Sequence, residues 1–160
     1  MSATNRGTIR DPKDFYPTPL KSFVRLVTFL PKVPTLEPAQ GDGRLVRAMT
    51  AAGIEVVGSD LFPQDGSQPV DFLKTDGYYS CIVTNPPFSL AEEFVEHAIK
   101  LAPEVYLLLR LAFLEGMRWR KKGFQDHLSR VWVFAPRLPF MHRHGYEGPK
   151  NSNSGMPFAW

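Results

Sequence analysis

The 160-residue chain contains a single cysteine, Cys81, which excludes a disulfide framework and a zinc site built from cysteines. Its four histidines show no metal-ligand spacing, so we expect no metal centre. No run of about 18 apolar residues occurs, and the first residues lack the apolar stretch of a signal peptide. These absences predict a cytoplasmic protein with no membrane segment and no metal.

The size and composition are those of one soluble globular domain. A hydrophobic content of 43% over 160 residues is enough for one proper core, and the sequence shows no internal repeat and no linker. Residues 1–14 are polar and without periodicity, which predicts a flexible arm. We therefore expect a single domain over residues 1–160, with no separate domain for target recognition.

Positive charge is confined to the last third of the chain. Residues 1–109 hold 10 Lys and Arg against 13 Asp and Glu, net −3, whereas residues 110–160 hold 9 against 3, net +6. A solvated cationic surface is the simpler explanation, but interleaved cations and aromatic rings suit a polyanion with stacking bases. The cations interleaved with rings are Arg118, Arg120, Lys121, Lys122, Arg137, Arg143 and Lys150, and the rings among them are Trp119, Phe124, Phe140 and Tyr146.

Apolar periodicity predicts alternating strands and helices. Short runs rich in β-branched and aromatic residues indicate strands, and apolar residues three and four apart indicate helices. This alternation favours an α/β fold with a mostly parallel sheet flanked by helices. The predicted strands are 33–36, 54–59, 79–83, 105–109 and 131–134. The predicted helices are 20–30, 44–52 and 90–101, and the stretch 110–128 is predicted to be largely helical.

The most informative stretch is Thr84-Asn85-Pro86-Pro87-Phe88, directly after a buried strand. Two consecutive prolines force the chain out of the sheet, so Asn85 stands at a strand's carboxyl end, where open α/β sheets bind ligands. The Asn85 carboxamide oxygen and the Pro86 carbonyl are two acceptors in a rigid turn, followed by the Phe88 ring. This arrangement suits a planar group that carries an NH₂. The alternative is a proline-rich loop capped by an asparagine.

A second stretch, from Glu37 to Gly43, places a Gly-x-Gly turn between a strand and a helix. Gly41 and Gly43 allow backbone N–H groups to approach a ligand closely. Val46 stands where a dinucleotide fingerprint has its third glycine, and no Gly-Lys-Ser/Thr follows. Nicotinamide, flavin and nucleoside-triphosphate ligands are therefore disfavoured.

Acidic residues follow the next elements of the chain. Asp60 ends the strand after the Gly-x-Gly turn, where a carboxylate takes both hydroxyls of a ribose. Leu61 and Phe62 follow it and are suited to cover an adenine ring. Asp71, next to Phe72, either accepts from an adenine amino group or caps a helix.

Together, these motifs in this order resemble the S-adenosylmethionine-dependent amino methyltransferases, and most of all the N(6)-adenine DNA methyltransferases of bacteria and their phages. The resemblance covers about residues 15–160 and implies a Rossmann-like class I methyltransferase fold. It also implies S-adenosylmethionine as cofactor and DNA as partner. Relatives continue into a final sheet strand, so this strand is expected to be short or missing here.

The resemblance assigns roles residue by residue. Tyr16, Thr18 and Pro19 border the cofactor, Glu37 holds its methionine amino group, and Gly41 and Gly43 approach its methionine part. Asp60 binds the ribose of the cofactor. Leu61 and Phe62 cover the face of its adenine ring, and Asp71 and Phe72 contact the edge of that ring. Asn85, Pro86, Pro87 and Phe88 act on the target base, and Arg137 and Phe140 belong to a segment that packs on the flipped base. The charge pattern, and not the resemblance, adds DNA contacts by Arg118, Lys121, Lys122, Arg137 and Arg143.

The implied activity is methyl transfer to the exocyclic amino nitrogen of adenine in DNA, with short or weak sequence specificity. Cytosine in DNA and adenine in RNA are nearby variants of the same substrate class. A methyltransferase of protein glutamine amides is an alternative, because those enzymes also present an Asn-Pro-Pro-aromatic turn to a planar NH₂. A non-catalytic protein that binds the cofactor and docks on nucleic acid is the third hypothesis.

Overall fold

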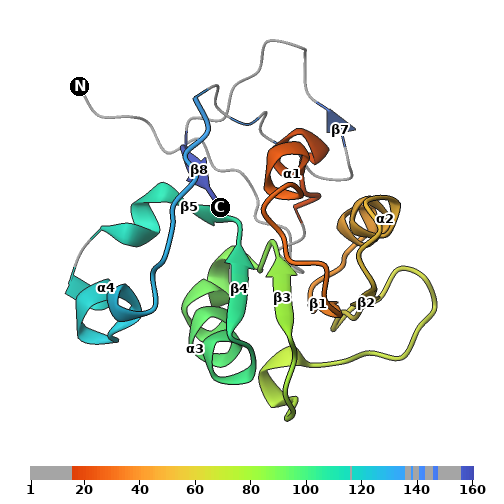
Figure 1. Ribbon diagram of the computed structural model, residues 1–160, viewed down its shortest axis with the longest axis horizontal. Helices are drawn as coiled ribbons and strands as arrows, with labels where there is room; N and C mark the ends of the chain where they lie inside the picture. Colours follow the sequence, from red (N-terminus) through yellow and green to blue (C-terminus); the bar gives the residue numbers. More distant parts are fainter. Residues whose placement is uncertain (1–15, 116, 136–137, 139–140, 143–145, 148–155) are drawn as a thin grey trace.

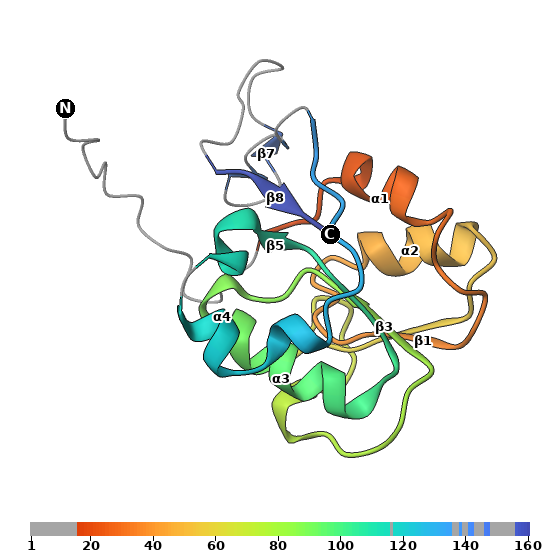
Figure 2. The same ribbon diagram turned by 60° about the vertical axis from the view of Figure 1, so that its left-hand side comes forward.

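The computed structural model describes residues 16–115, 117–135, 138, 141–142, 146–147 and 156–160. Its centre is a four-stranded sheet in the order β2-β1-β3-β4, with every neighbouring pair parallel. Helices cover both faces of this sheet, as Figures 1 and 2 show, which confirms the predicted α/β class with a parallel sheet. The strands are β1 (Thr35–Glu37), β2 (Val56–Gly58), β3 (Cys81–Thr84) and β4 (Glu104–Leu107).

Two apolar clusters, one on each face, bury the sheet. All four residues of β3 are buried, as expected for a strand with helices on both sides. Cys81 and Val83 pack into the cluster beneath α1 and α2, whereas Ile82 packs into the cluster beneath α3. Figure 2 shows these helices on opposite sides of the sheet. Their bounds are Leu20–Leu26 for α1, Arg44–Ala51 for α2 and Ala91–Leu101 for α3.

A short antiparallel ladder extends the sheet region beyond β4. β5 (Leu109–Arg110) pairs with β8 (Phe158–Ala159). Trp160 then exchanges two backbone hydrogen bonds with Trp132, and its indole N–H donates to the Ser22 carbonyl at 2.8 Å. The last strand is therefore present but short, and Trp160 ties it to α1.

The stretch 110–128, predicted to be largely helical, forms short helical segments instead of one continuous helix. Arg110 belongs to β5, and the remainder is divided into short helical segments. Gly123 adopts a left-handed φ of 68°, which ends α4, while Phe113, Trp119 and Phe124 pack against one another across the segments. Ring packing and the glycine override the helical propensity of the basic stretch. The segments are η3 (Leu111–Leu114), α4 (Met117–Lys121) and η4 (Phe124–Asp126).

Smaller differences concern the ends of elements. The predicted helix 20–30 ends at Leu26, and the predicted strand 131–134 is reduced to an isolated bridge between Val133 and Ala159. No helix in the described part of the chain is long and apolar enough to cross a membrane. The remaining elements are η1 (Phe72–Lys74), η2 (Phe88–Leu90), β6 (Met141–His142) and β7 (Tyr146–Glu147).

Candidate functional site

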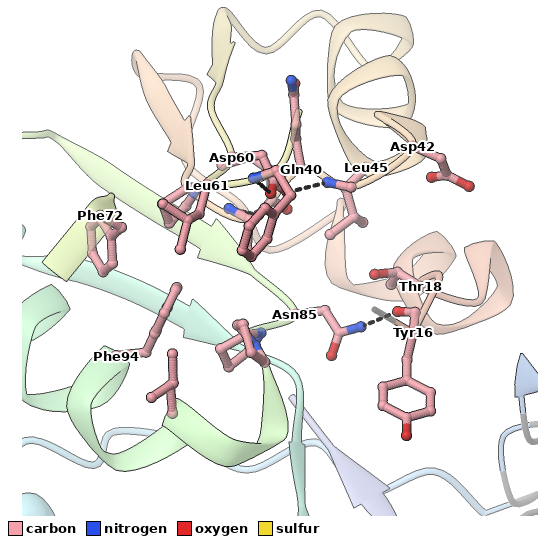
Figure 3. Close-up of a pocket in the computed structure, with 18 of the residues that line it drawn as sticks. Tyr16, Thr18, Gln40, Asp42, Leu45, Asp60, Leu61, Phe72, Asn85 and Phe94 are labelled. Carbon is pink, nitrogen blue, oxygen red and sulfur yellow. Dashed lines mark hydrogen bonds between the residues drawn. The ribbon is translucent and has the colours of Figure 1, made fainter. Parts of the chain in front are cut away.

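A cavity of about 290 Å³ opens at the carboxyl ends of the parallel strands (Figure 3). The chain leaves β1 toward β2 on one side and later enters β3 on the other side, so the strand order reverses between β1 and β3. Such a switch point leaves a crevice that binds ligands in open α/β sheets. We call this space the strand-end cavity. Of the predicted residues, Tyr16, Thr18, Glu37, Gly41, Asp60, Leu61, Phe62, Asp71, Phe72, Asn85, Pro86 and Pro87 line it, whereas Pro19, Gly43 and Phe88 do not.

Glu37, the last residue of β1, is 0% exposed. Its Oε1 accepts the Ala39 N–H at 3.1 Å, but its Oε2 is buried without a hydrogen-bond partner. Leaving a buried carboxylate oxygen unpaired costs free energy, so proteins normally provide each with a donor. The unpaired oxygen of Glu37 is therefore suited to a ligand that donates, and most of all to a cationic one.

Asn85 directly follows β3 and presents a second unpaired acceptor. Its Nδ2 donates to the Tyr16 carbonyl at 3.0 Å, which fixes the orientation of the amide. The Oδ1 is then left buried and without a partner on the other side. β1, which ends in Glu37, and β3, which Asn85 follows, are neighbours, and both residues line the same cavity.

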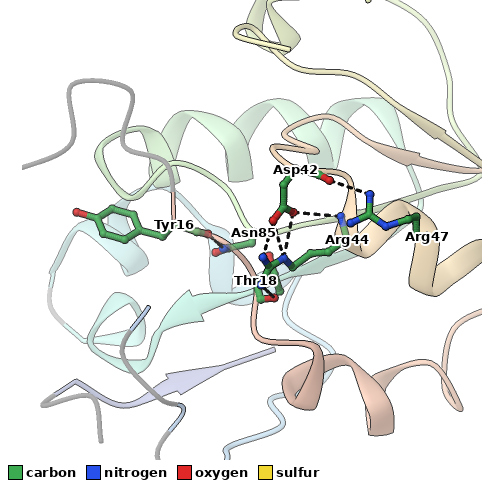
Figure 4. A network of polar contacts seen from close by, with 6 residues as sticks. All are labelled: Tyr16, Thr18, Asp42, Arg44, Arg47 and Asn85. Carbon is green, nitrogen blue, oxygen red and sulfur yellow. Dashed lines mark hydrogen bonds and ion pairs between the residues drawn. The ribbon is translucent and has the colours of Figure 1, made fainter. Parts of the chain in front are cut away.

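Segment 16–18 forms one wall of the cavity (Figures 3 and 4). Hydrogen bonds connect it to the Asn85-Pro86-Pro87 turn and to Arg44, the residue after the Gly-x-Gly turn. Besides the bond from Asn85 to Tyr16, the Arg44 guanidinium donates to the Thr18 carbonyl at 3.4 Å. Arg44 is itself paired with Asp42 of the Gly-x-Gly turn, and Arg47 donates to the Asp42 carbonyl at 2.9 Å. Gly43 has a φ of 74°, which lets the chain turn from Asp42 into α2.

Asp60 connects two of the loops that line the cavity. One carboxylate oxygen accepts the Gly41 N–H at 2.8 Å and the other accepts the Phe62 N–H at 2.7 Å. Each oxygen keeps one further lone pair for a ligand. Asp60 thus holds the Gly-x-Gly turn beside the 61–62 turn. This positioning role was not predicted from the sequence. Figure 3 shows Asn85 across the cavity from Asp60 and Leu61.

Apolar side chains offer a surface for a flat ring. Leu61 is 43% exposed and Phe62 49% exposed, and both line the cavity. Phe72 is buried and contacts Phe94 in the cavity wall. Asp71 caps η1 by accepting the Leu73 N–H at 3.2 Å, so the helix-cap alternative is confirmed, although Asp71 also lines the cavity.

The Phe88 ring lies outside the cavity lining, within a cluster of rings and one cation. Tyr16 stacks on it with centroids 5.0 Å apart, and Phe158 contacts it at 5.5 Å. The Arg110 guanidinium carbon lies 4.7 Å from the same ring centroid. A planar group can therefore stack against Phe88, and in this structure the Tyr16 side chain does so.

Burial raises the pKa of Glu37 to about 8, against an ordinary value of 4.5. The neighbouring Thr84 hydroxyl and the Ala39 N–H lower it in part, and the negative charge of Asp60 raises it further. Thr84 Oγ1 is itself buried and completes no hydrogen bond of normal geometry. Without a ligand, Glu37 is mostly protonated at neutral pH.

This raised pKa predicts a dependence of stability on pH. The contribution of Glu37 is fully present below about pH 4.5 and is lost as pH rises to about 8, at most on the order of 5 kcal/mol. Glu37→Gln cannot ionise, so we expect the variant to gain on the wild type as pH rises and to be the more stable at pH 8. Urea unfolding at pH 5, 6.5 and 8 measures this difference, and two parallel curves would contradict it.

The structure describes only some of the residues predicted to contact nucleic acid. Lys121 is exposed, but Lys122 pairs with Glu96 at 2.6 Å and with Glu92 at 3.4 Å, which ties it to α3. These two glutamates raise the pKa of Lys122, chiefly through the hydrogen bond to Glu96. Arg118 lies in α4. Arg137, Phe140 and Arg143 lie outside the described residues.

Several residues of the site were missed from the sequence. Arg44 and Asp42 tie the Gly-x-Gly turn to segment 16–18, and Gln40 lines the cavity beside them. A charged pair two residues apart inside a glycine turn is a local signal that points to such a clamp. Arg110 gave no signal, since nothing local in the sequence links it to Phe88.

No family model, curated protein or solved structure matches this chain. Among the described residues, no group of three or more His, Cys, Asp or Glu side chains is arranged to hold a metal ion.

Proposed function

We propose that this protein transfers a methyl group from S-adenosylmethionine to the exocyclic amino nitrogen of adenine in DNA. The observation that carries the proposal is a pair of buried, unpaired oxygens, Glu37 Oε2 and Asn85 Oδ1, on two residues that line one cavity. One belongs to a carboxyl group that suits a ligand's ammonium, and the other to an amide that suits a planar NH₂. A cofactor and a target amine together would satisfy both.

The residues around the cavity fit the proposed cofactor. Glu37 would hold the ammonium of its methionine part, and the remaining lone pairs of Asp60 would take ribose hydroxyls. The exposed faces of Leu61 and Phe62 would cover its adenine ring, beside Asp71 and Phe72 at the ring edge. The cavity volume, about 290 Å³, is close to the lower end of the range for small-molecule sites.

The fold supports the same proposal. A parallel sheet in the order β2-β1-β3-β4, continued by the antiparallel β5 and β8 ladder, is compatible with a Rossmann-like class I methyltransferase fold. Its switch point lies between β1, which ends in Glu37, and β3, which Asn85 directly follows. Cofactor and substrate sites would then meet at adjacent strand ends.

Catalysis would rest on how the chain holds the target amine. S-adenosylmethionine, when bound, supplies the methyl group. Asn85 Oδ1 accepts one amino hydrogen and the Pro86 carbonyl accepts the other, which makes the nitrogen lone pair available for attack. The Tyr16 carbonyl keeps the Asn85 amide in the orientation that this requires. After transfer the extra proton leaves to solvent.

Charge favours a nucleic acid as substrate. Residues 110–160 carry net +6, and exposed cations such as Arg120 and Lys121 lie in this region. Binding should come largely from phosphate contacts, which position the protein on DNA without reading its sequence. We therefore propose that sequence specificity is short or weak.

Labelled S-adenosylmethionine tests the proposal directly. The protein is incubated with DNA, RNA or a glutamine-containing release-factor domain, and the nucleic acids are digested to nucleosides. We expect the label in N(6)-methyladenosine from DNA. Label in the protein substrate would support glutamine methylation instead, and cofactor binding with no label in any substrate would support a non-catalytic role.

A further inference from the structure

Arg110 is the last residue of β5, at the edge of the Asn85 turn. The backbone of Leu108 donates to the Thr84 carbonyl at 3.0 Å, which fixes β5 beside the end of β3. From this position the Arg110 guanidinium lies over Phe88, three residues after Asn85. Its Nε is buried and has no hydrogen-bond partner. None of the ion pairs among the described residues includes Arg110.

The Arg110 Nε lacks the acceptor that a buried N–H requires. A guanidinium is always charged and has five N–H donors, so burying part of it without an anion is unfavourable. The contact with Phe88 uses only the face of the guanidinium plane. The N–H bonds lie in that plane, so an acceptor meets them at the edge of the plane and not over its face. A phosphate matches this planar fork in two-point contact.

We propose that Arg110 binds a backbone phosphate next to the target nucleotide and so places the base amine against Asn85. This inference rests on the proposed function and narrows its substrate to a nucleotide within a strand. A nucleotide combines a planar amine with an adjacent anion, whereas a glutamine side chain carries no anion. The net +6 of residues 110–160 also favours a polyanion over a single carboxylate.

The test is a double-substitution cycle between the arginine and the phosphate. Binding of a fluorescent single-stranded oligonucleotide with one adenine is measured by anisotropy, so no methyl transfer is needed. Neutral methylphosphonate linkages replace the phosphates on either side of the adenine, one at a time. The proteins are the wild type, Arg110→Gln, Arg110→Lys and the control Arg25→Gln, which alters an exposed arginine of α1.

We expect one neutral linkage to weaken wild-type binding about tenfold or more. Arg110→Gln should weaken binding of the unmodified strand by a similar factor and be insensitive to that linkage, while Arg110→Lys stays sensitive and Arg25→Gln behaves as wild type. The proposal would be overturned if the substitution Arg110→Gln and the neutral linkage weakened binding independently, so that their factors multiplied. Unchanged affinity in Arg110→Gln, or no binding by the wild type, would overturn it as well. Arginine-dependent binding of an acidic glutamine peptide instead would assign Arg110 to a carboxylate and overturn it too.

The phosphate contact of Arg110 and the proposed methyl transfer are contradicted by different results. Coupling between Arg110 and one phosphate without any methyl transfer would leave the anion site standing and remove the proposed function. Methyl transfer to adenine without this coupling would support the proposed function and remove the phosphate site at Arg110. If Arg110→Gln unfolds, Arg110→Lys provides the test, because it keeps the positive charge. A lysine variant of normal stability whose binding is insensitive to every neutral linkage would count against a phosphate contact.

Discussion

Asn85→Ala is expected to slow methyl transfer at least about a hundredfold at saturating substrates, because the turn then holds the target amine by the Pro86 carbonyl alone. The substitution also removes the hydrogen bond to the Tyr16 carbonyl, worth about 0.5–1.5 kcal/mol. Cofactor affinity should therefore fall by no more than about tenfold. Single-turnover kinetics and calorimetry on the same variant measure the two effects separately.

Asn85→Asp is the matched control for this result. It keeps an acceptor toward the target amine but cannot donate to Tyr16, and it places a carboxylate against that carbonyl. Transfer should fall less than in Asn85→Ala, which would assign most of the effect to the acceptor. Normal turnover at saturation in Asn85→Ala, together with a large loss of cofactor affinity, would show that Asn85 serves the cofactor instead.

Residues at strand ends were predictable because their signals are local. An apolar run followed by two prolines places Asn85 just after β3, and β3 does end at Thr84. A short strand before a Gly-x-Gly turn places Glu37 at the end of β1. These signals depend on neighbours in the sequence, so no tertiary contact was needed to find them.

The roles that emerged only from the structure depend on contacts between distant residues. The Asn85 to Tyr16 hydrogen bond joins residues 69 positions apart, and β5 pairs with β8 across almost fifty residues. Asp60 was expected at the ligand, but its two bonds to the Gly41 and Phe62 N–H groups depend on how the loops fold together. One continuous helix over 110–128 is prevented by ring packing and by the left-handed Gly123.

Glu37 carries the second large effect, a coupling between cofactor binding and proton release. An ammonium bound at Oε2 favours the ionised carboxylate, whereas burial keeps the free carboxyl protonated up to about pH 8. Below that pH each unit of acidification should weaken binding by up to about tenfold, since one pKa unit is about 1.36 kcal/mol. Above it the ligand's own α-amino group, with a pKa of about 7.7–8.0, begins to lose its proton. Affinity should therefore be highest near pH 8.

Glu37→Gln should remove this coupling and weaken the cofactor at least about a hundredfold at pH 8, as expected when one partner of a buried charge pair is lost. Calorimetry in buffers of different ionisation enthalpy should find close to one proton released per wild-type complex near pH 6.5, and none in the variant. 5′-Methylthioadenosine, which lacks the ammonium, is the control ligand and should bind both proteins alike at every pH. Wild-type affinity for S-adenosylmethionine that is constant from pH 6 to 8, with a variant of equal affinity, would place the ammonium away from Glu37.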